Sequence, residues 1–189
     1  MSFLSRRSLI IGFLTGLSLV SIGPAYSQET AKPAPAQTVI DTAVKRADSS
    51  GKTTLVVFHA SWCGWCKRLD KSVLNDPEMG KLLGKYFEIV HLDVMENEDK
   101  KALENPGGNE ILATLGGAKS GLPFYAVLDK SGKKLADSNA MPKNGNIGYP
   151  ASAEEITAFI GVLKKAAPRL TAAEEAQITA HLKKVAPKS

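Results

Sequence analysis

The chain of 189 residues contains only two cysteines, Cys63 and Cys66, and they are separated by two residues. A disulfide across so short a loop stabilises a fold little, because its benefit grows with the loop that it removes from the unfolded chain. The pair is therefore better explained by redox chemistry than by cross-linking. Apolar content of 43% and charged content of 23% are ordinary for a globular domain, which needs no disulfide to build its core.

The two cysteines lie between a predicted strand and a predicted helix. Residues 53–59 (TTLVVFH) form a short apolar, β-branched run, which is typical of a buried central strand, and residues 67–74 favour a helix. At the start of such a helix, free N–H groups and the helix dipole favour the thiolate of Cys63, which is predicted to be the nucleophile. Cys66, expected to be more buried, is predicted to resolve the mixed disulfide.

The rest of the chain alternates between helical and strand patterns. Helices are predicted over residues 38–49, 79–86 and 109–115, and further strands over residues 87–94, 124–128 and 134–137. Capping boxes at residues 152–155 and 171–174 open two more helices. This order predicts an α/β fold, in which a mixed central β-sheet has helices on both faces and an extra C-terminal helix follows.

The expected domain organisation follows from these elements. It comprises a signal peptide (1–27), a disordered lead-in (28–37), the α/β domain (38–168) and a C-terminal helical extension (169–189). On the last helix, Ile178, Leu182 and Val185 form an apolar stripe that is expected to pack on the domain, with partner binding as the alternative. His181 on the same helix is expected to be exposed.

Residues 57–67 (VFHASWCGWCK) resemble the active-site segment of the thioredoxin superfamily. The chain is most similar to exported thioredoxin-like disulfide reductases and to thiol:disulfide interchange domains of bacterial electron-transfer proteins. Residues 121–124 (GLPF), before a predicted strand, resemble the cis-proline segment of the same family. The resemblance covers residues 38–163 and implies a thioredoxin-like fold. It also implies a cis Leu122–Pro123 bond beside the disulfide, where both residues shape the substrate groove through β-like main-chain contact.

The chain departs from the thioredoxin pattern at the strand before the cysteines. Thioredoxins carry a buried carboxylate there, which accepts the proton of the resolving cysteine, but Val57 occupies this position. His59 stands where the family usually has a large aromatic residue, and His91 falls near a lysine of thioredoxins. We hypothesise that His59 or His91 supplies the missing acid/base function, since imidazole titrates in the required range. The alternative is that both histidines are structural.

Two tryptophans flank the predicted nucleophile. Trp65 replaces the proline or histidine common between the cysteines of relatives, and it cannot stabilise the Cys63 thiolate as a charged histidine would. This favours reductase or isomerase activity over strong oxidation. Trp62 and Trp65 are predicted to offer an apolar face to a substrate protein, with packing of Trp62 beneath the helix as the alternative.

The N-terminal residues are typical of an export signal peptide. Arg6 and Arg7 precede an apolar run over residues 9–22, and residues 25–27 (AYS) predict cleavage after Ser27. The arginine pair fits either the Sec or the twin-arginine route. An uncleaved anchor is a further alternative, although the run is shorter than the ~20 residues of a spanning helix. The expected location is the periplasm.

The mature chain is only mildly basic, because removal of Arg6 and Arg7 lowers its formal charge from +5 to +3. This charge, without a dense basic run, argues against nucleic-acid binding. The predicted function is thiol–disulfide exchange on exported proteins, without a cofactor. The expected partners are disulfide-containing substrates and a thiol–disulfide electron-donor protein, in the membrane or free of it.

Two other classes of function stay open at this point. A metal site, for zinc or copper, would use both thiolates and His59 as a third ligand, which is an incomplete set for structural zinc. A binding module that kept the fold without turnover would place partner contacts in glycine-rich loops such as residues 139–150. The strand–turn–helix context of the cysteines and the presence of Pro123 favour redox chemistry, so no metal is predicted.

Overall fold

The computed structural model describes residues 32–187, so the predicted signal peptide lies outside the described residues. A single four-stranded sheet runs through this part of the chain, in the order β2 (Phe87–Asp93), β1 (Thr53–His59), β3 (Phe124–Leu128) and β4 (Lys134–Asp137). Strand β1 is parallel to β2 and antiparallel to β3, and β3 is antiparallel to β4. The predicted mixed sheet is therefore confirmed.

Strand β1 is buried on both faces, as its continuous apolar run predicts. Leu55 and Val57 belong to the core on one face of the sheet, whereas Val56 and Phe58 belong to the core on the other. Successive side chains of a strand point to opposite faces, so a strand that is covered on both sides is apolar along most of its length. The central position of β1 also places the residues that follow it at the middle of the domain.

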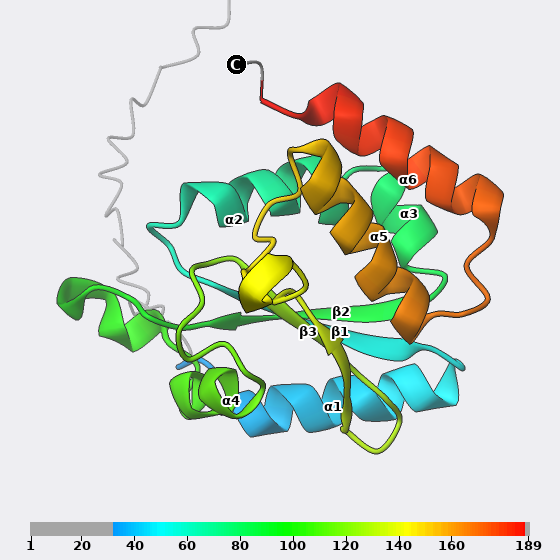
Figure 1. Ribbon diagram of the computed structural model, residues 1–189. Helices are drawn as coiled ribbons and strands as arrows, with labels where there is room; N and C mark the ends of the chain where they lie inside the picture. Colours follow the sequence, from blue (N-terminus) through cyan, green and yellow to red (C-terminus); the bar gives the residue numbers. More distant parts are fainter. Residues whose placement is uncertain (1–31, 188–189) are drawn as a thin grey trace, which may run out of the picture. The chain divides into compact units, whose positions relative to one another are not determined.

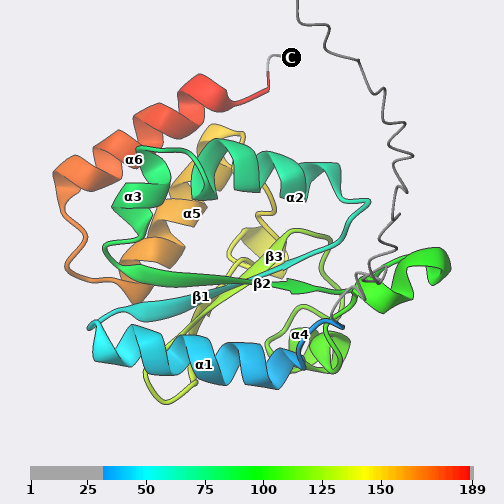
Figure 2. The same cartoon turned by 180° about the vertical axis from the view of Figure 1, so that it is seen from behind.

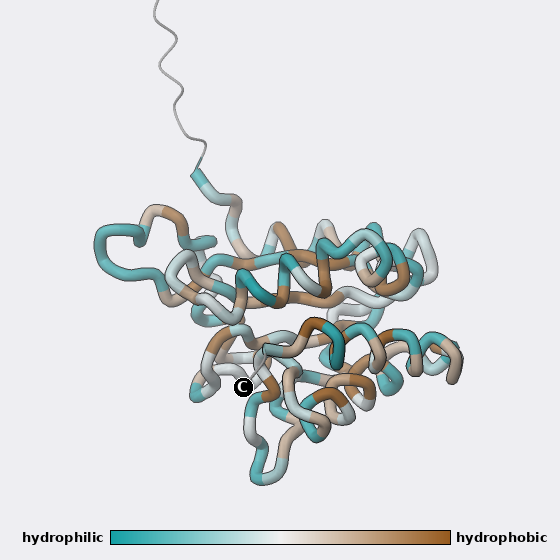
Figure 3. The backbone as a smooth tube through the Cα atoms, turned by 90° about the horizontal axis from the view of Figure 1, so that it is seen from above, coloured by the Kyte–Doolittle hydropathy of each residue, from teal (hydrophilic) through white to brown (hydrophobic). Residues whose placement is uncertain are grey.

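Helices cover both faces of the sheet (Figures 1 and 2). Helices α1 (Ala36–Ser49) and α4 (Gly108–Thr114) lie on one face. On the opposite face lie α2 (Gly64–Leu69), α3 (Met79–Leu83) and α5 (Ala153–Ala166), and α6 (Ala172–Val185) packs outside α3 and α5. Apolar segments gather where the helices meet the sheet, while the outlying loops are mostly hydrophilic (Figure 3). Among the described helices, none is long and apolar enough to cross a membrane.

Helix α1 begins at Ala36, inside the segment that was expected to be a disordered lead-in. Ala36 is fully buried, and its N–H donates to the carbonyl oxygen of Pro106 at 2.8 Å. The side-chain amide of Asn105 also donates to the carbonyl of Ala34 at 2.8 Å. These contacts from a distant loop order residues 34–37, and composition alone does not reveal them.

The helix that follows the cysteines is not α-helical to its end. Helix α2 stops at Leu69 and continues as a π-helix over Asp70–Leu74, with the N–H of Asn75 donating to the carbonyl of Asp70 at 2.8 Å. The wider π turn lets the adjacent Val73 and Leu74 both enter the core. Two short 3₁₀ helices are also present, over Glu98–Leu103 and over Pro142–Asn144, and the second lies in the segment that was expected to be a loop.

The C-terminal helices begin as predicted. Both capping boxes are formed, by Ser152 with Glu155 at α5 and by Thr171 with Glu174 at α6. The apolar stripe of α6 packs on the domain, as expected, with Ile178 fully buried.

The prediction for His181 on α6 is wrong, because this side chain is half-buried rather than exposed. Its Nε2 atom lies 2.6 Å from the carbonyl oxygen of Ser72, in the π-helix. A carbonyl oxygen can only accept, so the imidazole N–H donates. The contact ties α6 to the helix that carries the cysteines.

Candidate active site

Cys63 and Cys66 form a disulfide at the start of α2. Cys63 is the N-cap residue, and its sulfur accepts a hydrogen bond from the backbone N–H of Cys66 at 3.1 Å. Both residues are almost completely buried, with 3% and 2% of their surface exposed. The two residues therefore do not differ in burial in the oxidised form, whereas Cys66 was expected to be more buried. An N–H aimed at the sulfur of Cys63 would also stabilise a thiolate there.

The second motif lies against the disulfide. The Leu122–Pro123 peptide bond is cis, and β3 begins directly after it. Leu122 packs against a small buried cluster formed by Ala60, Cys63 and Cys66. The two segments that the sequence separates by more than fifty positions are thus brought together at one end of the sheet.

A surface groove of about 360 Å³ lies beside this junction. It is lined by Trp65, Leu122, Ile147, Gly148, Tyr149, Ala151 and Glu155. The ring of Trp65 stacks on Tyr149 at a centroid distance of 5.7 Å, and the guanidinium of Arg68 lies over both rings. The carboxylate of Glu155 is engaged by the N–H groups at the start of α5. The groove therefore offers the rings of Trp65 and Tyr149 and the aliphatic side chains of Leu122 and Ile147, together with polar groups, to a side chain next to the disulfide.

Both tryptophans are exposed at the active-site surface. Trp62 is 48% and Trp65 52% exposed, which excludes the alternative that Trp62 packs beneath the helix. The indole N–H of Trp62 donates to the carbonyl of Met95 at 2.8 Å, and Met95 is itself exposed. Three of the four large exposed hydrophobic residues in the described chain thus lie close to the cysteines in sequence or contact. Such an exposed apolar patch is typical of a protein-binding surface.

The two histidines lie together on the face of the sheet that α2 covers. Their ring centroids are 5.0 Å apart, and each has a carboxylate partner. His91 Nε2 lies 2.7 Å from Asp70, which belongs to the π-helix, and His59 Nε2 lies 3.3 Å from Asp93. Burial lowers the pKa of His59 below its usual value despite the opposing charge of Asp93, and burial likewise raises the pKa of Asp93.

Val57 is buried beside His91 in the register of β1 and β2, so no carboxylate occupies that position. Each histidine instead pairs with the carboxylate of a neighbouring aspartate at the edge of the core. This arrangement is compatible with proton transfer and equally with a structural ion pair. The acid/base role of His59 or His91 stays a prediction.

Glu96 is a site residue that sequence reasoning missed. Its carboxylate is buried, with 3% of the residue exposed, and accepts from both the backbone N–H (2.5 Å) and the hydroxyl (2.7 Å) of Ser61. Ser61 lies two positions before Cys63, so Glu96 fixes the loop that leads into the disulfide. No motif links these residues, because their contact depends on how the segment after β2 folds back.

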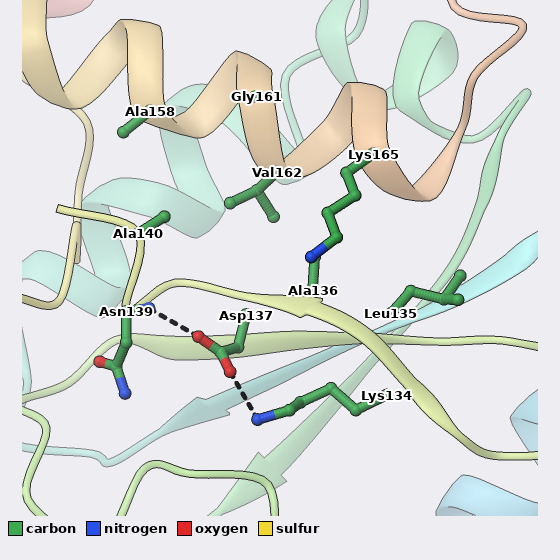
Figure 4. A pocket seen from close by; sticks show the side chains of 10 residues that line it. All are labelled: Lys134, Leu135, Ala136, Asp137, Asn139, Ala140, Ala158, Gly161, Val162 and Lys165. Carbon is green, nitrogen blue, oxygen red and sulfur yellow. Dashed lines mark hydrogen bonds and ion pairs between the residues drawn. The ribbon is translucent and has the colours of Figure 1, made fainter. Parts of the chain in front are cut away.

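In the described part of the chain, His, Cys, Asp and Glu side chains form no group of three suited to a metal ion. A second hollow of about 450 Å³ lies between β4 and α5 (Figure 4). There Asp137 pairs with Lys134 and also accepts from the N–H of Asn139. None of the predicted site residues lines this hollow, so it is separate from the disulfide site.

Comparisons with known proteins agree with this geometry. A family model described as thioredoxin-like matches residues 36–130. Over 90 residues the chain is 30% identical to the thiol:disulfide interchange protein DsbD of Photorhabdus laumondii subsp. laumondii, which covers 48% of this chain and only 14% of that protein.

Two solved structures are also similar. A disulphide isomerase from Xylella fastidiosa Temecula1 has 23% identity and a TM-score of 0.48, covering 87% of this chain and 98% of that one. The C-terminal domain of Neisseria meningitidis DsbD in the oxidised form has 25% identity and a TM-score of 0.38, covering 55% and 82%.

Proposed function

Since the chain belongs to the thioredoxin-like family, we propose that it is a thiol–disulfide oxidoreductase that acts through Cys63 and Cys66. The observation that carries the proposal is the disulfide at the start of α2, packed against Leu122 and beside a surface groove that Trp65 lines. An N–H already directed at the sulfur of Cys63 supports its role as the nucleophile.

In the reducing direction, the Cys63 thiolate attacks one sulfur of the substrate disulfide. A mixed disulfide forms, and the other substrate sulfur leaves as a thiolate that takes up a proton. Cys66 then loses its proton and attacks the sulfur of Cys63, which releases the second substrate thiol and closes the Cys63–Cys66 disulfide. Two electrons pass from the dithiol to the substrate, and a thiol–disulfide donor protein restores the dithiol by the reverse exchange. No cofactor takes part.

Substrate contact is assigned to the residues that surround the disulfide. The exposed rings of Trp62 and Trp65 supply apolar contact area, and the main chain at Leu122 and Pro123 pairs with an extended substrate segment. The groove beside Trp65 accepts an apolar side chain near the substrate cysteine.

The proposed direction is reduction rather than oxidation, and the proposed location is the periplasm. Trp65 between the cysteines carries no charge, so nothing between them favours the thiolate as a protonated histidine would. Export rests on the signal peptide predicted over residues 1–27. The donor protein would meet this chain outside the cytoplasm, and a membrane-bound donor fits that place.

Reduction of a peptide disulfide, with dithiothreitol as the electron source, tests the proposal. Wild type should reduce the peptide, and C63S should be inactive because it lacks the nucleophile. Reduced C66S, mixed with the peptide disulfide after dithiothreitol has been removed, should accumulate a mixed disulfide through Cys63, visible as a mass increase equal to one peptide strand. A wild-type rate no faster than dithiothreitol alone would overturn the proposal.

A further inference from the structure

We propose that Asn146 is a positioning residue that holds the Leu122–Pro123 segment ready for an extended peptide substrate. The inference rests on the proposed function and deepens it, because it assigns the preference for an extended peptide over a small thiol reagent to one side chain. Asn146 lies in the loop between β4 and α5, far in sequence from both cysteines.

The amide of Asn146 spans the segment that packs on the disulfide. Its Nδ2 atom donates to the carbonyl oxygen of Gly121 at 2.7 Å and to that of Pro123 at 3.1 Å. Carbonyl oxygens only accept, so the side-chain nitrogen must face them. The two bonds fix the carbonyls on both sides of Leu122. The main chain of Leu122, which is the part that would pair with a substrate strand, is therefore held from both ends.

The loop that carries Asn146 is itself fixed to the sheet. Ser138 is buried and forms hydrogen bonds to strand β3 on one side and to the loop that carries Asn146 on the other. Its N–H donates to Tyr125, its hydroxyl accepts from the N–H of Tyr125, and its carbonyl accepts from the N–H of Ile147. Asn146 thus precedes an anchored residue, and Ile147, Gly148 and Tyr149 go on to line the groove. The side chain connects the two walls of the groove, one at Leu122 and the other at residues 147–149.

The oxygen atom of the same amide makes an unfavourable contribution to stability in this orientation. The Oδ1 atom of Asn146 is buried without a hydrogen-bond partner among the described residues. An unpaired buried acceptor is unfavourable, and the two bonds from Nδ2 offset it. Replacement by alanine removes the two bonds and the unpaired oxygen together. The free energy of unfolding should therefore change little, while the geometry of the Leu122 segment is released.

Asn139 provides a matched control from the same loop. Its Nδ2 donates to the carbonyl of Gly116 at 2.9 Å, and its Oδ1 accepts from the hydroxyl of Ser120 at 2.7 Å. Like Asn146, Asn139 therefore makes two side-chain hydrogen bonds to the segment before β3. Neither of them reaches a residue next to Leu122, so N139A loosens the same loop without touching the substrate-pairing main chain.

The experiment compares wild type, N146A, N146D and N139A. For each protein, KM and kcat are measured with a peptide disulfide, and the second-order rate of the oxidised protein is measured with dithiothreitol. N146A should raise KM for the peptide about tenfold, as expected for two lost hydrogen bonds, with kcat changed less. N146D places a carboxylate against two carbonyls and should raise KM further. Reaction with dithiothreitol, which needs only the sulfur, should change less than about twofold, and N139A should match wild type.

The outcomes separate the inference from the function on which it rests. Equal KM values for N146A, N146D and wild type, in a protein that still reduces the peptide, would overturn the positioning role alone. Equal losses with peptide and dithiothreitol would overturn it too, since they would indicate a general structural effect. A wild-type protein that reduces no peptide disulfide would overturn the proposed function itself.

Discussion

At the residue scale, the buried carboxylate of Glu96 acts on the loop before Cys63. Its two hydrogen bonds to Ser61 hold a negative charge two positions from the predicted nucleophile. A nearby buried negative charge disfavours a thiolate, so Glu96 should keep the pKa of Cys63 higher than the helix start alone would allow. This effect acts in the same direction as Trp65 and favours a reducing rather than an oxidising site.

The variant E96Q should therefore lower the pKa of the Cys63 thiol in the reduced protein. Glutamine keeps an acceptor for the N–H of Ser61 and removes only the charge. The measurement is the pH dependence of iodoacetamide alkylation at Cys63, with E98Q, at an exposed position nearby, as the control. An E96Q profile that overlies the wild-type profile, or moves to higher pH, would contradict the electrostatic role.

The histidine cluster predicts a pH dependence of stability. The pKa of His59 is lowered in the fold, mainly by burial, so between its folded value and about 6.5 the unfolded chain binds the proton and the native chain does not. Stability from this group is complete above pH 6.5 and falls as the pH drops through that window. Burial is the main cause of the lowered pKa of His59; the neighbouring His91 adds to it, whereas the carboxylates of Asp93, Asp70 and Glu96 oppose it.

The variant H59Q should lose less stability than wild type as the pH falls below about 6.5, because glutamine does not titrate. Urea unfolding of wild type and H59Q at closely spaced pH values measures this difference, and an equal dependence of the free energy of unfolding on pH in the two proteins would contradict the prediction.

The rate of disulfide exchange against pH, measured in the same variants, tests the separate hypothesis that His59 moves the proton of Cys66. An unchanged profile would leave His59 with a structural role only.

At the element scale, α6 is part of the domain and not a loose extension. Leu182 is fully buried in the core shared with α3 and α5, and Tyr86 and Lys85 both bind Glu174 near the start of the helix. L182A should reduce the free energy of unfolding by about 2–5 kcal/mol, as is usual for a cavity in a core. The exposed control K183A should stay within about 0.5 kcal/mol of wild type. A small effect of L182A, measured by denaturant unfolding, would contradict docking of α6.

The elements show which features local sequence determines. Strand β1 and both capping boxes depend on neighbouring residues, and they were predicted correctly. The π-helix after α2 and the contact between His181 and Ser72 depend on packing against elements that are distant in sequence. A local pattern cannot predict such contacts. Residues 70–74 were therefore expected to be α-helical, and His181 was expected to be exposed.

At the scale of the whole molecule, the site was predictable only in its motifs. The positions of Cys63, Cys66 and Pro123 follow from two short segments with their own signals, and the sheet brings those segments together. Glu96 and Asn146 reach the site from loops whose paths are set by tertiary contacts. Supporting residues of this kind carry no spacing signal, so a single sequence does not reveal them.

The reduction potential of the Cys63–Cys66 pair tests the central claim most directly. The protein is equilibrated with glutathione buffers, and its free thiols are counted by mass spectrometry after alkylation. A reductase should show a reversible two-thiol transition at about −250 mV or below, in the range of thioredoxin. A potential near about −120 mV would make the protein an oxidant and contradict the proposed direction. A pair that never forms a disulfide in any buffer would contradict the oxidoreductase function altogether.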